Sequence, residues 1–242
     1  MPTGDGRLAS AFDSPLAKRA YVRRLFSTIA SRYDLITVLL SYGQDRRWKR
    51  QLLRLADARP GIDALDVACG TGDIAFGLAG MGARVVGLDV THRMLQLAMS
   101  KQEARASKAA FVTGDMMALP FADNRFDVVT TGYGIRNVPD ITTALAEMRR
   151  VLRPGGQLLS LDFDRPSHPV VRAGYLAYLT VVGSAVGWLL HRDPDTYRYI
   201  PESIRRYPGA ARVSALMREQ GFKSSDHIPV LGGLMAIHRA TK

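Results

Sequence analysis

The loop Asp66–Asp73 (DVACGTGD) carries small and acidic residues suited to holding a charged cofactor. It follows an apolar run at 64–68 and precedes a helical pattern at 72–81, so a glycine-rich turn leads from a strand into a helix. Glycine permits a tight turn and close approach of a ligand to the backbone. Asp89 lies nineteen residues after Gly70. These features predict a nucleotide-type cofactor at the end of the first strand.

Charge distinguishes between two such cofactors. Gly70–Ala75 (GTGDIA) also satisfies the dinucleotide pattern G-x-G-x-x-G/A. A dinucleotide would place its pyrophosphate at the helix N-terminus, where the carboxylates of Asp66 and Asp73 repel it. No Lys or Arg occurs between positions 60 and 83. S-adenosylmethionine has no phosphate and carries an ammonium and a sulfonium, so the loop favours this cofactor, with S-adenosylhomocysteine as its product.

Further cofactor contacts are expected at the carboxyl ends of the strands. Asp89 is placed to accept both ribose hydroxyls, and Asp115 to accept from the adenine amino group, although a turn or N-cap role also suits Asp115. The Met116 N–H faces a ring nitrogen in this interpretation, and Met94 serves either the adenine face or the core. The predicted cofactor set is Asp66, Gly70, Thr71, Gly72, Asp89, Met94, Asp115, Met116 and Gly132.

Alternating apolar runs and helical patterns after residue 63 predict an α/β fold. The fold class is a Rossmann-like methyltransferase sheet, mostly parallel, with helices on both faces. The expected strands are 64–68, 84–88, 109–113, 126–131 and 157–163, and the expected helices are 72–81, 91–105 and 140–152. A helix at 210–220 precedes strands near 223–230 and 234–240, which form an antiparallel hairpin because no helix separates them.

The N-terminal quarter is strongly basic. Helical patterns at 16–30 and 45–56 overlap residues 17–54. This range holds ten Lys or Arg against two acids, a net +8 of the chain's +11. Such a surface attracts nucleic acid or an anionic membrane, or is simply a solvated face. A single cysteine, Cys69, excludes an internal disulfide. The histidines lack the spacing of metal ligands, so no metal is expected.

Ala173–Leu190 (AGYLAYLTVVGSAVGWLL) runs for eighteen residues without a charge. That length raises the question of a membrane span, but the glycines, the tyrosines and basic flanks at both ends favour a helical flap over an apolar substrate pocket. The expected organisation is one domain with four parts. They are a basic helical cap (1–56), the cofactor-binding α/β core (57–165), the flap (166–208) and a C-terminal helix with its hairpin (209–242).

Several motifs together resemble the C-methyltransferases of ubiquinone and menaquinone biosynthesis. The matching stretches are Arg32–Lys49 (RYDLITVLLSYGQDRRWK), DVACGTGD, Met117–Phe121 (MALPF), Gly134–Val138 (GIRNV), Arg150–Gly156 (RVLRPGG), Leu161–Phe163 (LDF), Tyr197–Arg205 (YRYIPESIR) and Ala236–Arg239 (AIHR). The chain departs from the family at Ile36 and Thr37, where Met-Asn is common, at Asp45, often a histidine, and at Gly132, often a serine.

The resemblance implies transfer of a methyl group to a ring carbon beside a hydroxyl of a polyprenylated hydroquinone. Arg136 would favour the phenolate because its guanidinium is always cationic. Asn137 would orient the second oxygen. Proton removal needs a base or a relayed water, and the candidate bases are Tyr33, Asp162 and His168, which the sequence alone does not distinguish. Tyr197 and Tyr199 are expected to bind the ring, with Arg136 as a further substrate contact.

The implied partners are a lipophilic quinol and an anionic bilayer, on which the basic N-terminal helix would rest. The expected location is cytoplasmic, peripherally associated with a bacterial inner membrane. No nucleic acid is expected, and homodimerisation is left open. Three alternatives remain at this point. The acceptor is another lipophilic phenol or natural product, or the protein binds RNA, in which case the binding weakens steeply with added salt. The third alternative is a non-catalytic assembly partner that binds no cofactor.

Overall fold

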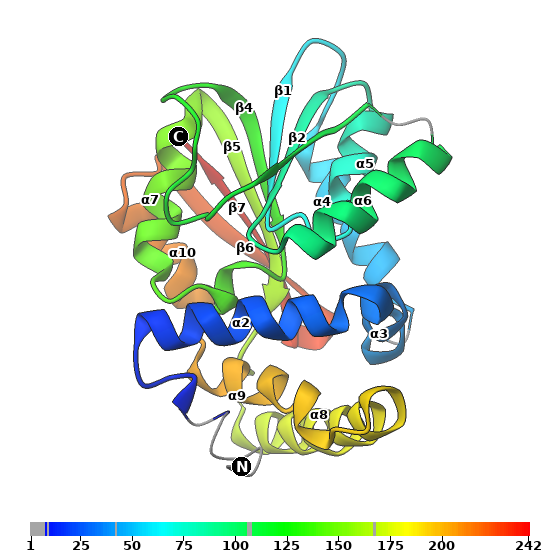
Figure 1. Ribbon diagram of the computed structural model, residues 1–242. Coiled ribbons are helices and arrows are strands. Elements are labelled where there is room, and N and C mark those ends of the chain that lie inside the picture. The colour runs from blue at the N-terminus through cyan, green and yellow to red at the C-terminus, as the bar shows by residue number, and fades with distance from the viewer. Residues whose placement is uncertain (1–7, 9, 42, 106–107, 167) are drawn as a thin grey trace.

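The computed structural model describes residues 8, 10–41, 43–105, 108–166 and 168–242, and a seven-stranded sheet forms its centre (Figure 1). The strand order is β3-β2-β1-β4-β5-β7-β6. The strands β1 to β5 pair in parallel, and β7 pairs antiparallel with both β5 and β6. Their bounds are β1 Asp63–Val67, β2 Arg84–Asp89, β3 Ala110–Thr113, β4 Phe126–Gly132, β5 Leu152–Phe163, β6 Ser224–Val230 and β7 Met235–Thr241.

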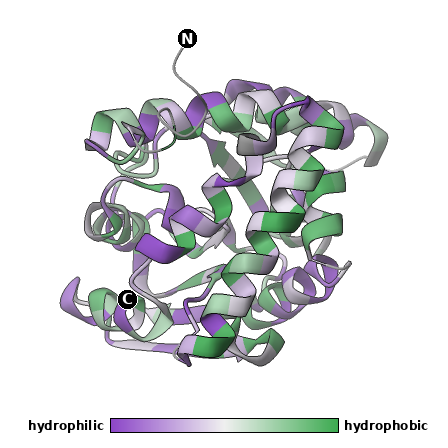
Figure 2. Ribbon diagram, turned by 90° about the horizontal axis from the view of Figure 1, so that it is seen from below, coloured by the Kyte–Doolittle hydropathy of each residue, from purple (hydrophilic) through white to green (hydrophobic). Residues whose placement is uncertain are grey.

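Helices cover both faces of the sheet, as the apolar strands require. One group comprises α4 (Asp45–Ala56), α5 (Asp73–Gly80) and α6 (His92–Arg105), and the other α7 (Ile141–Val151) and α10 (Ala210–Glu219) (Figure 1). Hydrophobic and hydrophilic segments adjoin along the same helices (Figure 2). This alternation fits helices that turn one stripe toward a core and another toward water.

Further helices cover the carboxyl ends of the parallel strands. In Figure 1, α2 crosses this end of the sheet, and α8 and α9 form another layer beyond it. Ligands bind at this end of open α/β sheets, so these helices form the walls of a site there. The elements are α2 Pro15–Ile29, η1 Ala30–Arg32, α3 Tyr33–Leu40, η2 Ile135–Asn137, α8 Pro169–His191, η3 Pro194–Tyr197, α9 Tyr199–Arg206 and η4 Leu231–Gly233.

The predicted fold class is confirmed, including the C-terminal antiparallel hairpin. The expected strand 157–163 is longer, because β5 begins at Leu152 and its register on β4 shifts between Phe126 and Val128. Two helices, α3 and α9, were not predicted. Both have only eight residues. A proline usually argues against a helix, but Pro201 lies in the first turn of α9, where a helix tolerates proline.

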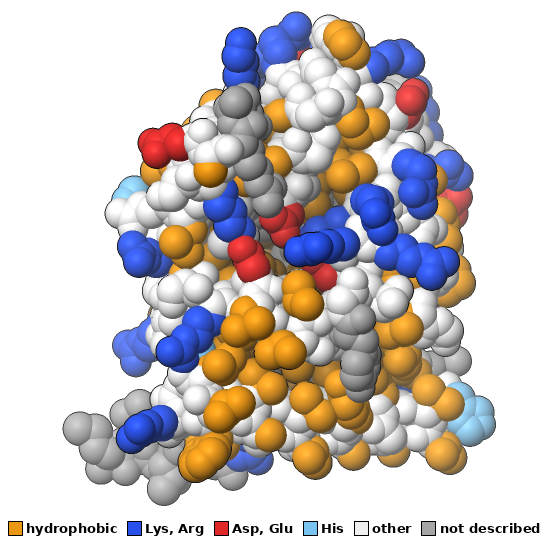
Figure 3. Space-filling model, turned by 90° about the vertical axis from the view of Figure 1, so that its right-hand side faces the viewer, with side chains coloured by type: hydrophobic (Ala, Val, Ile, Leu, Met, Phe, Trp, Pro, Cys, Tyr) orange, Lys and Arg blue, Asp and Glu red, His pale blue; other side chains and the backbone are white. Residues whose placement is uncertain are grey.

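Of the described helices, α8 is the one long and apolar enough to cross a membrane, judged by length and composition alone. Only 17% of its most apolar window is buried within the protein. In Figure 3, hydrophobic side chains gather over the lower part of the molecule, where α3 and α8 lie in Figure 1. The helix therefore leaves much apolar surface uncovered by the rest of the chain.

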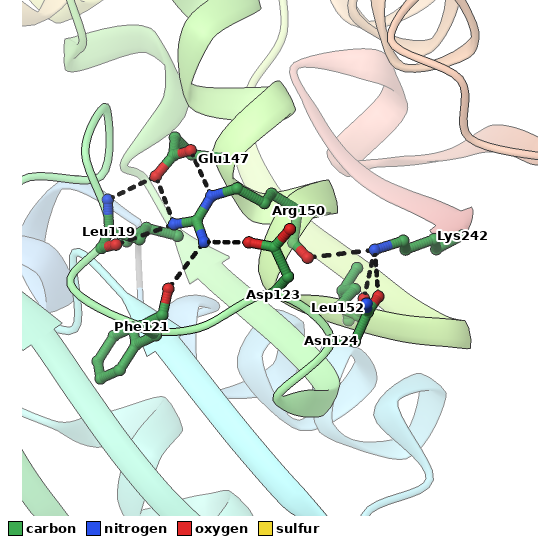
Figure 4. A network of polar contacts seen from close by, with 8 residues as sticks. All are labelled: Leu119, Phe121, Asp123, Asn124, Glu147, Arg150, Leu152 and Lys242. Atoms are coloured by element: carbon green, nitrogen blue, oxygen red, sulfur yellow. Dashed lines mark hydrogen bonds and ion pairs between the residues drawn. The ribbon is translucent and has the colours of Figure 1, made fainter.

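Arg150 at the end of α7 fixes the loop that leads into β4 (Figure 4). Its guanidinium donates to the carbonyl oxygens of Leu119 and Phe121, at 2.9 and 2.8 Å, and pairs with Glu147 and Asp123. Glu147 in turn accepts the Leu119 N–H at 2.7 Å. Nearby, the Lys242 ammonium donates to the carbonyls of residues 150 and 152. One side chain thus satisfies several backbone groups that have no strand partner.

We expect Arg150→Met to lower the free energy of unfolding by about 2–3 kcal/mol, because partly buried carbonyls and Glu147 lose their charged donor. Urea denaturation measures this change. Arg212→Met is the matched control, since Arg212 pairs with Glu219 on the exposed surface, where an ion pair contributes about 0–1 kcal/mol. Equal losses in the two variants would contradict the role given to Arg150.

Candidate active site

Three adjoining cavities open at the carboxyl ends of the strands. The apolar cavity, about 440 Å³, lies among α2, α3, α8 and α9 and is lined by residues such as Phe26, Ile36, Tyr178, Tyr197 and Ile200. The central cavity, about 90 Å³, is lined by residues that include Asp89, Met94, Asp115, Met116 and Gly132. The loop cavity is lined by Asp66, Gly70 and Thr71, among others. Tyr33 and Tyr133 line all three, so the cavities meet at these two side chains.

Asp89 and the glycine-rich loop hold one another in place. The Asp89 carboxylate accepts the N–H of Gly70 at 2.9 Å and that of Thr91 at 2.8 Å. Gly72 has φ +89°, and a Cβ there would lie 2.8 Å from the Phe76 ring, so only glycine fits this turn. Gly72 is not among the residues that line the cavities described above. Its contribution is therefore to shape the turn.

Asp66, within β1, presents a carboxylate that is only half satisfied. Its Oδ1 accepts the Thr130 hydroxyl at 2.8 Å, whereas its buried Oδ2 has no hydrogen-bond partner among the described residues. Burial raises the pKa of this carboxyl to about 7. A cationic amino group in the loop cavity would supply the missing donor and favour the ionised form. The residues present therefore fit the ammonium of S-adenosylmethionine.

Asp115 faces the central cavity at the other end of the predicted cofactor site. Its Oδ1 accepts the N–H of Met117 at 2.9 Å, and its Oδ2 pairs with Arg19 of α2 at 2.9 Å. The side chains of Met94 and Met116 are buried and line the same cavity. The structure thus brings the two methionines to the wall that Asp115 and Asp89 also line.

The absence of basic residues around the loop holds in sequence but not in space. Lys49 of α4 reaches the loop and pairs with Asp73 at 3.0 Å and with Asp45 at 2.8 Å. The charge of Asp73 is therefore compensated by a residue twenty-four positions earlier in the sequence. Asp66 and Asp89 carry the remaining acidic character of the site.

The basic N-terminal helix also turns part of its charge inward. The Lys18 ammonium donates to the carbonyls of Arg136 and Val138, at 3.1 and 2.5 Å. Burial, with the nearby charge of Arg136, lowers the pKa of Lys18 to about 8. Together with the ion pair from Arg19, this contact fastens α2 over the central cavity. Arg23 and Arg24 stay exposed on the same helix.

Arg136, in η2, is the one charged side chain among the described residues that line the apolar cavity. Its guanidinium pairs with Asp162 at 3.2 Å, donates to Ser203 Oγ at 3.2 Å and lies over the Phe163 ring at 4.7 Å. Both members of the pair are buried. The cavity therefore offers a cation held in fixed orientation within an apolar wall.

The other predicted substrate and catalytic residues are divided between the cavities. Asn137 lines the central cavity, where its side-chain amide donates to the Tyr133 carbonyl at 2.8 Å, whereas Arg136 lines the apolar cavity. Tyr197 and Tyr199 line the apolar cavity, and the Tyr197 hydroxyl bonds His191 at 2.9 Å. His168 is exposed before α8 and is not among the lining residues.

Tyr133 was not predicted as a site residue, although it lies between the two glycines Gly132 and Gly134. Its hydroxyl donates to Asp45 at 2.7 Å, and both residues are buried. Its φ of +62° is rare for a non-glycine residue. The glycine-flanked tyrosine was one available signal, and the departure from histidine at Asp45 was another.

The parallel sheet, the glycine loop and the carboxylates of Asp66 and Asp89 define an S-adenosylmethionine-dependent methyltransferase. Residues 15–242 match the ubiE/COQ5 methyltransferase family, and the chain belongs to that family. The ubiquinone/menaquinone biosynthesis C-methyltransferase UbiE of Shewanella oneidensis is 38% identical over 230 residues, covering 93% of this chain and 92% of that protein. UbiE of Shewanella sp. strain W3-18-1 is 37% identical over the same shares.

Solved structures share the fold at low sequence identity. A methyltransferase from Thermotoga maritima has a TM-score of 0.63 at 19% identity, covering 91% of this chain and 99% of that one. A second, from Aquifex aeolicus, has a TM-score of 0.58 at 16% identity, covering 80% and 88%. The architecture is thus common to methyltransferases whose sequences have diverged widely.

Proposed function

We propose that this chain methylates a ring carbon of a polyprenylated hydroquinone. Its UbiE relatives are named ubiquinone/menaquinone biosynthesis C-methyltransferases. The observation that carries the proposal is the apolar cavity. It is large enough for a substituted ring, meets the central cavity at Tyr33 and Tyr133, and contains one charge, Arg136. A lipophilic acceptor with an ionisable hydroxyl matches that combination.

The cofactor is assigned to the central and loop cavities. Asp66 would hold its amino group, Asp89 its ribose hydroxyls, and Asp115 with the Met116 N–H its adenine. Gly70, Thr71 and Gly132 line the path between these positions. The bound cofactor supplies an electrophilic methyl group on a sulfonium, so the protein itself needs no strong acid.

The protein's task is to orient the ring and to favour its phenolate form. Arg136 stabilises negative charge on the ring oxygen, and the apolar surroundings strengthen that interaction because little water screens it. Tyr197 and Tyr199 form the wall of the apolar cavity on the side of α9 and would contact the ring there. Asp162 keeps the guanidinium in place through its hydrogen bonds to the side chain and the backbone N–H of Arg136.

Radiolabelled S-adenosylmethionine tests this function directly. The purified chain is incubated anaerobically with a chemically reduced naphthohydroquinone and with a benzohydroquinone, each carrying a short prenyl chain. Label in a ring methyl of either product supports the proposal. Tight cofactor binding without label in either product would direct attention to another phenolic acceptor.

Cofactor affinity is expected to weaken as the pH falls below 7. Asp66 has a pKa near 7 in the free protein and must ionise to pair with an ammonium. The dissociation constant should therefore rise up to about tenfold per pH unit below 7 and level off above it. Calorimetric titration between pH 5.5 and 8.5 measures this. Asp66→Asn should bind more weakly with little pH dependence, and an unchanged slope in that variant would contradict the assignment.

We also propose a cytoplasmic, peripheral contact with an anionic bilayer through the apolar surface of α3 and α8. Large hydrophobic side chains are exposed there, including Trp188 at 66%. Exposed arginines precede α3, begin α4 and flank α8 in the sequence, namely Arg32, Arg46, Arg47, Arg165 and Arg192. Because the same helices line the apolar cavity, a prenylated substrate would reach the cavity from lipid. The expected contact was the basic N-terminal helix, and this proposal adds the apolar surface of α3 and α8.

We expect the double change Trp188→Ser and Leu189→Ser to reduce binding to vesicles containing anionic lipid by about tenfold or more, because two large apolar anchors are lost. Sedimentation with vesicles measures the effect. Arg23→Glu with Arg24→Glu is the comparison, on α2. If this second variant alone lost binding, the basic helix would be the membrane surface instead.

A further inference from the structure

Tyr133 occupies the point at which the three cavities meet, and its hydroxyl is held firmly. The O–H donates to Asp45 Oδ1 at 2.7 Å, and the backbone N–H donates to the Leu161 carbonyl at 2.7 Å. The ring is buried with Phe163, at 5.7 Å between centroids. A tyrosine fixed at both ends in this way presents one defined arrangement to a ligand.

Asp45 continues a polar line away from the cavities. Its Oδ2 pairs with Lys49 at 2.8 Å, and Lys49 pairs with Asp73 Oδ2 at 3.0 Å. Exposure increases along the line, since the side chain of Asp45 is 4% exposed, that of Lys49 13% and that of Asp73 35%. A polar connection thus runs from the buried tyrosine to the protein surface.

The direction of these hydrogen bonds limits what Tyr133 can do. Its only proton is committed to Asp45, so the phenolic oxygen has lone pairs left to accept a hydrogen bond. Arg136, the charged group of the apolar cavity, donates and cannot accept. Asp162 already accepts from the guanidinium, from the Arg136 N–H and from the Phe163 N–H. The Tyr133 oxygen is therefore free to accept a hydrogen bond from the ring hydroxyl of the substrate that receives the methyl group.

We propose that Tyr133 and Asp45 form a relay that removes the proton from the ring hydroxyl of the methyl acceptor. This proposal rests on the proposed function. The acceptor O–H bond breaks, its electron pair stays on the ring oxygen, and the proton moves to the Tyr133 oxygen. The original Tyr133 proton passes at the same time to Asp45 Oδ1. Arg136 then faces the phenolate, and Asp45 returns its proton to solvent before the next turnover.

The groups around the relay favour this sequence. Burial and the neighbouring Asp45 carboxylate raise the pKa of Tyr133 well above its ordinary value, so the tyrosine stays protonated at rest and relays a proton instead of holding a charge. The ammonium of Lys49 pairs with Asp45 Oδ2 at 2.8 Å and compensates the negative charge of that carboxylate. Tyr33 and Asp162 are the other titratable groups that act on Tyr133, and Asp73 and Tyr33 act together with Asp45 on Lys49.

Tyr133→Phe and Asp45→Asn test the relay with the reduced short-chain naphthohydroquinone and labelled S-adenosylmethionine. Each change should lower kcat about 100-fold at pH 7, as expected for loss of proton transfer. The double variant should lose no more than either single variant, because the residues act as one unit. The loss should diminish by about tenfold per pH unit between pH 7 and 9, as the acceptor ionises in solution, whereas the unmodified protein stays nearly constant.

Tyr207→Phe is the matched control, because it removes a buried hydroxyl without a partner among the described residues and lies outside the three cavities. It should retain full activity, and thermal unfolding and cofactor titration identify any variant that fails to fold. Full activity of Tyr133→Phe, or a loss that alkaline pH does not relieve, would overturn the relay alone. If the unmodified protein methylates no hydroquinone, the proposed function falls and the relay falls with it.

Discussion

Replacing Arg136 with leucine is expected to lower kcat for hydroquinone methylation about 100- to 1,000-fold, with the cofactor dissociation constant nearly unchanged. Leucine keeps an apolar side chain in the wall but removes the only charge among the described residues that line the apolar cavity. The phenolate would then develop without a counterion in surroundings that screen charge poorly. Steady-state kinetics and calorimetric cofactor titration measure the two quantities separately.

A second variant distinguishes a loss of activity caused by missing charge from one caused by a destabilised fold. Leucine at 136 leaves the buried carboxylate of Asp162 uncompensated, which costs about 3–5 kcal/mol of stability. Combining Arg136→Leu with Asp162→Asn should recover much of that stability, as measured by thermal unfolding, without recovering activity. If the double variant regained most of the activity, Arg136 would serve the fold and not the reaction.

The second large effect is expected at Asp89. Asp89→Ala should raise the cofactor dissociation constant about 100-fold or more, since hydrogen bonds to a charged group contribute about 1.5–3 kcal/mol each. The carboxylate would accept the ribose hydroxyls, and it already anchors the N–H groups of Gly70 and Thr91. Fluorescence or calorimetric titration with S-adenosylmethionine gives the measurement.

Asp127→Ala is the matched control for Asp89. Its carboxylate also accepts a backbone N–H, that of Asp63 at 2.8 Å, and pairs with Arg153. It belongs to the amino-terminal end of the strands, remote from the three cavities. We expect a loss of stability with unchanged cofactor affinity. A comparable loss of affinity in both variants would mean that the Asp89 effect is a general weakening of the sheet.

Much of the architecture could be predicted because it depends on local patterns. The alternation of apolar runs and helices, with no helix before the last strand, specified the sheet and its antiparallel hairpin. The positions of Asp66 and Asp89 followed from the same pattern, since each lies in or at the end of a parallel strand. Carboxyl ends of parallel strands meet at one edge of a sheet, so these two side chains could be expected to lie on the same side of the molecule.

The contacts made across long separations could not be predicted in this way. Lys49 and Asp45 come from a helix that precedes the sheet, yet they meet Asp73 and Tyr133 within the site. Separation along the sequence does not show which side chains meet in space. The argument from charge at the glycine-rich loop considered only neighbours in sequence and therefore overlooked Lys49. The placement of α2 across the strand ends, with α8 in a layer beyond it, is likewise a result of tertiary packing.

The position of α2 has a consequence for the timing of turnover. The central cavity beneath it has a volume of about 90 Å³, smaller than the roughly 300–1,000 Å³ of most ligand pockets. Lys18 and Arg19 fasten the helix from above, so cofactor exchange requires these contacts to release. α2 borders the apolar cavity through Leu25, Phe26 and Ile29, six or more residues beyond Arg19, and α8 forms another wall that the contacts of Lys18 and Arg19 do not hold. Spent cofactor would therefore leave after the methylated ring, and its residence time would set the pace of successive catalytic cycles.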